Sequence, residues 1–168
     1  MNVIETERLV LRRQTLEDAA FILALMNDPE WLRYIGDRGV RTHEEARAYI
    51  QEGALKMYDQ HGFGLYLMEL KRNRTPVGIC GLVKRNTLDD VDLGIALAHA
   101  YRGKGYAREA AAATVAYARD IVGLRRVVAI VASDNADSVR LLEGLGFSFE
   151  RTLDYPNGDR VDLLALAT

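Results

Sequence analysis

Tyr101-Arg102-Gly103-Lys104-Gly105-Tyr106-Ala107 is the most informative stretch of the sequence. It lies between a short apolar run, residues 91–97, and a run rich in helix formers, residues 108–118. A glycine-containing turn that opens a helix leaves main-chain N–H groups unpaired at the positive end of the helix dipole. Its two glycines let a phosphate approach without meeting a Cβ, and Arg102, Lys104 and Arg108 add positive charge. The stretch therefore predicts a site for a phosphorylated cofactor.

Two well-known phosphate-binding loops do not fit these residues. The nucleoside-triphosphate loop fails because Gly105 and Tyr106 follow Lys104, and the dinucleotide fingerprint fails because Arg108 stands at its last glycine. The pattern that fits is Arg-x-x-Gly-x-Ala, from Arg102 through Gly105 to Ala107. It resembles the pyrophosphate-binding signature of the GNAT superfamily of N-acetyltransferases, which use acetyl-CoA. On this motif alone, a solvated surface turn is the alternative.

The second half of the chain carries a second match. Residues 125–132 predict a buried strand, and residues 136–145 predict a helix that Gly146 ends. The pattern Asn135-x-x-Ser138-x-x-Leu141-x-x-x-x-Gly146-Phe147 resembles the second GNAT signature. The resemblance implies that the Asn135 side chain holds the pantetheine or phosphate arm of the cofactor.

Residues 6–12, Thr-Glu-Arg-Leu-Val-Leu-Arg, resemble the first strand of the GNAT branch that acetylates protein N-termini, including ribosomal-protein alanines. The three matches occur in the family's order and span residues 6–147. They imply an α/β fold of the GNAT type in one domain, residues 1–168. Its sheet is mixed and twisted, with helices on both faces. Two central strands splay apart, and acetyl-CoA enters the gap.

Capping and turn signals predict the remaining elements. Thr15, with Asp18 as its reciprocal partner, opens a helix to residue 26, and the capping box Thr42-x-x-Glu45 opens another to about residue 59. Residues 30–40 are predicted to be irregular. The predicted strands are residues 3–13, 62–71, 77–84, 91–97, 125–132, 147–155 and 160–167, with a turn at 156–159.

Composition excludes several classes of protein. The 168 residues, 49% of them hydrophobic, suffice for one compact domain. A net charge of −2 argues against a nucleic-acid partner. The single cysteine, Cys80, rules out an intramolecular disulfide, and it is predicted to lie in the core. The sequence shows neither a signal peptide nor a membrane span, so a cytoplasmic protein is expected.

The implied chemistry sets three demands. The acceptor amine must lose a proton, the thioester carbonyl must be polarised, and the CoA thiolate must leave. None of these demands a metal. The resemblance implies that main-chain groups of Ile95, Ala96 and Leu97 pair with the pantetheine arm and polarise the carbonyl.

The general base is ambiguous in the sequence. Asp92 lies on the strand that leads to the cofactor, where many relatives carry an acidic residue, but a solvent-facing aspartate is an equal alternative. Glu69 is expected on an exposed face, Asp154 in a solvated hairpin, and His99 as a loop residue.

The family's usual acid/base pair is missing. Leu142 stands where many relatives have a tyrosine that protonates the thiolate, and Ile130 where they have a glutamate. Ser138, on the first turn of the same helix, is the available substitute, and its alternative is a capping or surface serine.

Acceptor choice is expected to lie in the connection around Trp31 and Tyr34, although Trp31 packing on the sheet is the simpler interpretation. A protein N-terminus is the first candidate acceptor, and a small-molecule amine is the second. A catalytically silent acyl-CoA-binding sensor and a protein that binds another nucleotide are alternatives. Homodimer formation is left open.

Overall fold

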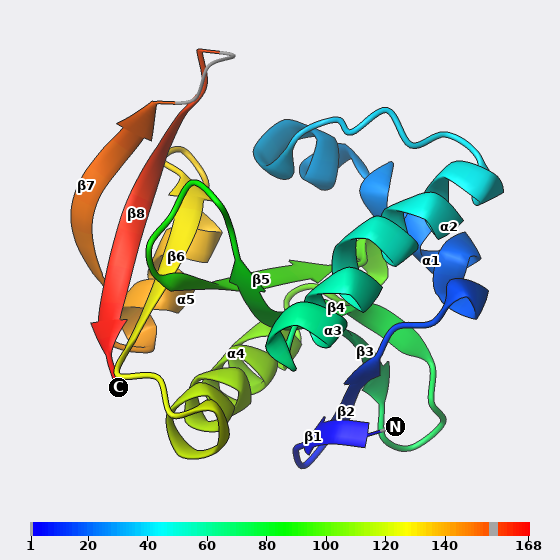
Figure 1. Cartoon of the computed structure of the whole chain (residues 1–168), viewed down its shortest axis with the longest axis horizontal. Coiled ribbons are helices and arrows are strands. Elements are labelled where there is room, and N and C mark those ends of the chain that lie inside the picture. The colour runs from blue at the N-terminus through cyan, green and yellow to red at the C-terminus, as the bar shows by residue number, and fades with distance from the viewer. Residues whose placement is uncertain (1, 155–157) are drawn as a thin grey trace.

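A computed structural model describes residues 2–154 and 158–168 (Figure 1). Within these residues, eight strands form one sheet in the order β1-β2-β3-β4-β5-β6-β8-β7. Neighbouring strands are antiparallel except β5 and β6, which are parallel. The strands are β1 (Asn2–Glu5), β2 (Leu9–Arg13), β3 (Leu65–Leu70), β4 (Pro76–Lys84), β5 (Val91–Leu97), β6 (Arg126–Ala132), β7 (Ser148–Asp154) and β8 (Arg160–Ala167). The α-helices are α1 (Ala19–Met26), α2 (His43–Ile50), α3 (Lys56–His61), α4 (Tyr106–Tyr117) and α5 (Ala136–Gly144). The prediction of a mixed sheet with helices is confirmed.

The two larger apolar cores cover opposite faces of the sheet. On one face, α4 and α5 pack over alternate strand residues such as Tyr66, Cys80 and Val127. On the other face, α1 and α2 pack over Leu67 and Ile79. The period-two alternation along β3 and β4 decides which side chains reach which core.

The predicted helix boundaries depend on side-chain caps, and the structure contains them. Thr15 and Asp18 form the complete reciprocal box before α1. The Thr42 side chain accepts the amide of Glu45, and the helix it opens runs on through α2, a π-helical turn at Gln51–Leu55 and α3. Gly146 follows α5 with φ of 102°.

Two predictions of local structure were wrong. The single first strand, residues 3–13, is a hairpin of β1 and β2, because Thr6 donates its amide to the Leu9 carbonyl in a tight turn. The segment predicted as irregular contains a π-helical turn at Trp31–Ile35. The predicted turn at residues 156–159 lies partly outside the described residues.

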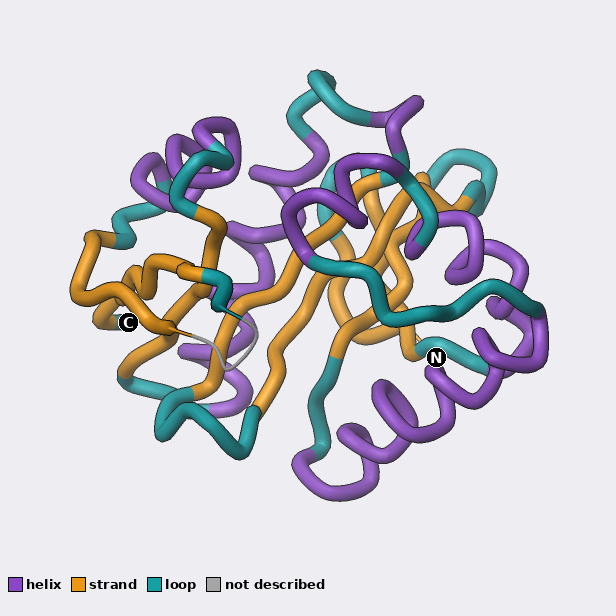
Figure 2. Tube along the Cα trace, turned by 90° about the horizontal axis from the view of Figure 1, so that it is seen from above, coloured by secondary structure: helices purple, strands orange, loops and turns teal. Residues whose placement is uncertain are grey.

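The central feature of the sheet is the divergence of its two parallel strands. Only Asp92 of β5 and Val128 of β6 pair, although each strand has seven residues. Beyond this pair the strands separate, and β6, β7 and β8 form a group apart from β1 to β4 (Figures 1 and 2). The polypeptide passes from the end of β5 to α4 and from the end of β6 to α5. The splayed strands expected from the resemblance are therefore present.

Two glycines provide a matched test of this packing. A Cβ at Gly81, in β4, would lie 2.0 Å from the Gly64 carbonyl oxygen, whereas a Cβ at Gly53, in the long helix, would meet nothing within 4 Å. Gly81→Ala should lower the free energy of unfolding by about 3 kcal/mol or more, because backbone must move. Gly53→Ala should raise it by about 0.5–1 kcal/mol. Urea unfolding measures both, and equal values for the two variants would contradict the strand packing.

Candidate active site

The turn between β5 and α4 has the backbone that the sequence predicted. Gly103 and Gly105 have φ of 75° and 84°, in the left-handed region that L side chains rarely adopt. A Cβ at Gly103 would meet nothing within 4 Å, so glycine is required there by conformation and not by space. Gly105 directly precedes the first residue of α4.

The turn leaves a row of main-chain donors free. Within the described part of the chain, the N–H groups of residues 103–108 make no hydrogen bond. They stand at the N-terminus of a twelve-residue helix, where the helix dipole is positive. Such a group of amides binds phosphate oxygens.

Arg102 fixes one end of the turn. Its Nη2 donates to the Leu97 carbonyl at 2.8 Å and to Asp28 Oδ1 at 2.9 Å, while Nε lies 3.3 Å from Glu30 Oε2. Nη1 lies 3.1 Å from Nδ1 of His99. The guanidinium predicted to add positive charge at the phosphate site is therefore held by protein partners.

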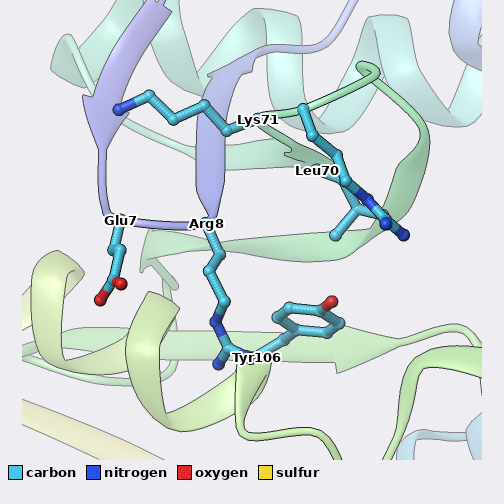
Figure 3. Close-up of a pocket in the computed structure, with 6 residues that line it drawn as sticks. Glu7, Arg8, Leu70, Lys71 and Tyr106 are labelled. Atoms are coloured by element: carbon cyan, nitrogen blue, oxygen red, sulfur yellow. The ribbon is translucent and has the colours of Figure 1, made fainter.

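Arg8 fixes the other end. From the β1–β2 turn it reaches toward Tyr106, lying 4.5 Å from the ring centroid (Figure 3). Its Nη1 donates to the Lys104 carbonyl at 3.0 Å, and its Nε donates to Glu109 Oε1 at 2.7 Å. A hollow of about 470 Å³ beside it is lined by Glu7, Arg8, Leu70, Lys71, Arg72 and Tyr106. Arg8 and Glu109 are organising residues that the sequence analysis did not identify.

Glu109 ties the N-terminal hairpin to α4. Its Oε2 accepts hydrogen bonds from the Thr6 hydroxyl at 2.5 Å and the Arg8 amide at 2.9 Å. Burial raises the pKa of this carboxyl, but the hydrogen bonds from Thr6 and Arg8 outweigh burial and hold the pKa below its ordinary value. Glu109 is therefore ionised at neutral pH and keeps Arg8 in place.

Two of the cations predicted near the phosphate site are exposed to solvent in or beside the turn. Lys104 and Arg108 are exposed. Arg108 Nη2 donates to the Gly144 carbonyl at 3.3 Å, which places this guanidinium between α4 and the end of α5. Lys104 and Arg108 thus add exposed positive charge near the unpaired amides, beside the guanidinium of Arg8.

On β5, the direction of the peptide groups decides which residues face the gap. The Ala98 amide donates to Val77 of β4, while the Leu97 carbonyl accepts from Arg102 on the opposite side. Because peptide groups alternate along a strand, those of Ile95 and Leu97 point toward β6. The same alternation turns the Ala96 peptide groups toward β4, and its side chain packs against the α1–α2 core.

Asn135 and Ser138 lie at the start of α5. The Asn135 Oδ1 accepts the Ser138 amide at 3.4 Å and caps the helix. Both residues are half-buried. Since β5 and β6 are parallel, α4 and α5 begin at the same edge of the sheet, and Ser138 lies one turn inside that edge.

Asp92 lies where β5 and β6 meet. It is 1% exposed, so the alternative of a solvent-facing aspartate is wrong. Its Oδ2 accepts a hydrogen bond from Arg85 Nε at 2.6 Å. Burial raises the pKa of the Asp92 carboxyl, and Arg85 opposes this shift without cancelling it. By strand alternation its side chain lies on the same face of the sheet as that of Ala96.

Residues 8–148 match the family model described as an acetyltransferase (GNAT) domain. The uncharacterised N-acetyltransferase YoaA of Bacillus subtilis is 32% identical over 95% of this chain and 92% of its own length. The chain belongs to the GNAT family of acetyltransferases. It is accordingly an N-acetyltransferase, in a family that uses acetyl-CoA.

Solved GNAT structures agree in fold. A GnaT-family acetyltransferase from Bordetella pertussis superposes with a TM-score of 0.82 at 28% identity, covering 99% of this chain and 100% of that one. RimL, a ribosomal L7/L12 alpha-N-protein acetyltransferase in complex with coenzyme A, has a TM-score of 0.82 at 20% identity. The match covers 99% of this chain and 98% of RimL. At that identity, RimL shows the fold alone.

Other acidic candidates of this GNAT protein have structural partners. Glu69 was expected on an exposed face, which is wrong: it is buried and pairs with Arg12 at 3.1 Å and Arg74 at 2.8 Å. Asp154 is exposed and pairs with Arg160 at 2.8 Å. These contacts account for both carboxylates without a role in the GNAT site.

Cys80 is a core residue of the GNAT domain, as predicted. It is fully buried, and its Sγ lies 3.3 Å from the Thr114 hydroxyl. Burial raises the pKa of the thiol to about 12, so it is not a nucleophile at neutral pH. Among the described residues, no group of three or more His, Cys, Asp or Glu side chains could hold a metal ion. No helix in that same part of the chain is long and apolar enough to span a membrane.

The connection around Trp31 and Tyr34, which is expected to determine the acceptor, lies beside the turn between β5 and α4, because Asp28 pairs with Arg102. Trp31 is buried against the sheet, as its simpler interpretation predicted. The Arg33 guanidinium lies 4.7 Å from the Tyr34 ring centroid. A second hollow, of about 450 Å³, is lined by Asp28, Pro29, Glu30, His99 and Arg102.

Glu109 clamps the N-terminal hairpin to α4 through its hydrogen bonds with Thr6 and Arg8. This clamp predicts that acid lowers the stability of the GNAT domain. A carboxylate whose pKa is lowered by folding stabilises the fold above its unfolded pKa of about 4.3, and this contribution is lost as the pH falls through the folded pKa. Glu109→Gln should therefore cost about 2 kcal/mol at pH 7, and the difference from wild type should shrink below pH 4.3. Urea unfolding across pH measures it, with the exposed Glu52→Gln as the control. A difference that stays constant with pH would contradict the clamp.

Proposed function

We propose that the protein binds acetyl-CoA with its pyrophosphate on the amides of residues 103–108 and transfers the acetyl group to a primary amine. The observation that carries this proposal is the row of unpaired N–H groups at the start of α4. They lie where β5 has left β6, so a ligand held there can extend between the two strands. Nucleoside triphosphate binding needs no such gap.

The residues present fit this cofactor. The positive-φ glycines keep Cβ atoms away from the anion, and Lys104 and Arg108 supply charge. The peptide groups of Ile95 and the Leu97 N–H can pair with the amide-bearing pantetheine arm, as a neighbouring strand would, while the Leu97 carbonyl accepts from Arg102. Asn135, at the start of α5, is the proposed side-chain contact to the same arm. When bound, acetyl-CoA supplies the thioester that is the acyl donor.

The chain's own groups can meet the demands of the reaction. The Ile95 N–H points into the gap and is suited to polarise a carbonyl oxygen. Asp92 is suited to take the proton from the acceptor, because burial moves its pKa toward the working pH of a base. Arg85 covers Asp92, so its side chain must shift to admit the amine or a relaying water. Ser138, at the start of α5, is the proposed donor to the departing sulfur.

The acceptor proposed first is a protein N-terminus, and a small-molecule amine is second. The N-terminal Thr-Glu-Arg-Leu-Val-Leu-Arg stretch and the fold shared with RimL support the first. The segment around the Trp31–Ile35 turn lies beside the glycine turn, through Arg102, where an incoming chain could contact it.

Cofactor binding can be tested with two glycines of equal backbone strain. Gly103 and Gly123 both have positive φ, 75° and 82°, and a Cβ at either would meet nothing within 4 Å. They flank the helix from opposite ends. Each change to alanine should cost about 1 kcal/mol of stability. Only Gly103→Ala should weaken acetyl-CoA binding, by about tenfold or more in calorimetry, because its amide must reorient. Equal affinities in the two variants would contradict the site.

The catalytic assignment predicts a separation of rate from affinity. Asp92→Asn and Ser138→Ala should each lower kcat by about 100-fold while leaving the Kd for acetyl-CoA within about twofold. Wild-type kcat should rise with pH through the raised pKa of Asp92, because the base acts when deprotonated, and this limb should vanish in Asp92→Asn. Assays with a panel of peptide and small amines measure both. Unchanged kcat in a folded Asp92→Asn would exclude Asp92 as the base.

A further inference from the structure

An ion-pair junction joins the cofactor turn to the acceptor-side segment. Its members are Arg102, at the start of the turn, Asp28 and Glu30, which follow α1, and the Leu97 carbonyl at the end of β5. Arg102 and Asp28 are 74 residues apart in the sequence. One planar guanidinium therefore contacts the end of the central strand and the segment that leads into the Trp31–Ile35 turn.

The inner pair of this junction is shielded from solvent. The side chains of Asp28 and Arg102 are 12% and 25% exposed, so salt screens their attraction less than that of a surface pair. Burial raises the pKa of Asp28, but the hydrogen bonds from Arg102 and the Glu30 amide, together with the charge of Arg102, outweigh burial and hold the pKa below its ordinary value. Asp28 Oδ1 also accepts the Glu30 amide at 3.0 Å, which orders the start of the turn.

The same segment also reaches the other side of the gap. Arg33 lies 3.6 Å from Asp134, which follows β6. Residues 28–33 thus contact the chain beyond β5 through Arg102 and beyond β6 through Asp134. Both Arg33 and Asp134 are about two-thirds exposed, so this outer pair fixes little by itself.

We propose that Arg102 is a positioning residue that couples occupation of the cofactor turn to the arrangement of the acceptor-side segment, residues 28–35. The inference rests on the proposed binding of acetyl-CoA at that turn. Arg102 keeps its contacts with Asp28 and Leu97 when the turn is occupied and does not move to the phosphate. Because the guanidinium connects turn and segment, a ligand that orders one orders the other.

Acetyl-CoA affinity alone tests this coupling, without knowledge of the acceptor. Asp28→Asn should weaken acetyl-CoA binding about fivefold in calorimetry, since the turn loses an anchor. In an Arg102→Gln background, which retains a donor for the Leu97 carbonyl, the same change should have no further effect. Asp37→Asn is the matched control, because Asp37 lies in the same connection but pairs with Arg41. Glu30→Gln should weaken acetyl-CoA binding less than Asp28→Asn does, because Glu30 lies farther from Arg102, at 3.3 Å. Glu30 is half-exposed, so this change carries little risk to folding.

The single tryptophan supplies a second readout. Trp31 is buried in the segment, and its indole Nε1 has no hydrogen-bond partner within the described residues. Saturating acetyl-CoA should change Trp31 emission in the wild type and in Asp37→Asn. It should leave the emission unchanged in Arg102→Gln at concentrations that saturate that variant. A purely structural role for Arg102 would not remove this signal.

The outcomes separate the two proposals. Tighter acetyl-CoA binding by Asp28→Asn would overturn the inference, because it would show Arg102 released to serve as a phosphate ligand. An effect of Asp28→Asn that persists in Arg102→Gln would overturn it as well. In both cases the cofactor site would stand. Failure of the folded wild type to bind acetyl-CoA at all would overturn the proposed function and this inference together.

Discussion

The site depends on a short left-handed turn that could not hold its shape unaided. Gly103 and Gly105 can adopt the required φ, but glycine is also the residue with most freedom to leave it. Two arginines remove that freedom by donating to main-chain carbonyls before and within the turn, Arg102 to Leu97 and Arg8 to Lys104. Each guanidinium is held in turn by carboxylates, so the amides between them stay aligned and unpaired.

Parallel pairing of β5 and β6 supplies the second constraint. Parallel strands send their following helices to the same edge of the sheet, so α4 and α5 begin together there. The two strands pair only at Asp92 and Val128, which leaves the β5 peptide groups that face β6 beyond that point without a strand partner. A ligand that enters from the turn can therefore use the sheet's own hydrogen-bonding pattern. Asp92 stands at the closed end of this gap, where the reacting groups are proposed to meet.

Local chemistry made much of the fold predictable. β5 and β8 have their predicted bounds, and the caps at Thr15 and Thr42 are present, because these features depend on neighbouring residues. The errors arose from long-range contacts. The first strand bends into a hairpin whose turn is bound by Glu109, about a hundred residues away. Alternation placed Glu69 on an exposed face, yet Arg12 and Arg74 pair with it there and bury it. The ion pairs of Arg102 likewise involve Asp28 and Glu30, which lie more than 70 residues away in the sequence, so no local pattern reveals them.

Hydrogen exchange at the turn tests the central claim most directly. The amides of residues 103–108 have no partners in the described residues and should exchange rapidly in the free protein. Saturating acetyl-CoA should slow exchange in peptides that cover these residues and leave those around Gly123, at the far end of the same helix, unchanged. Acetyl-CoA binding without any protection of residues 103–108 would contradict the assignment of the glycine turn as the pyrophosphate site.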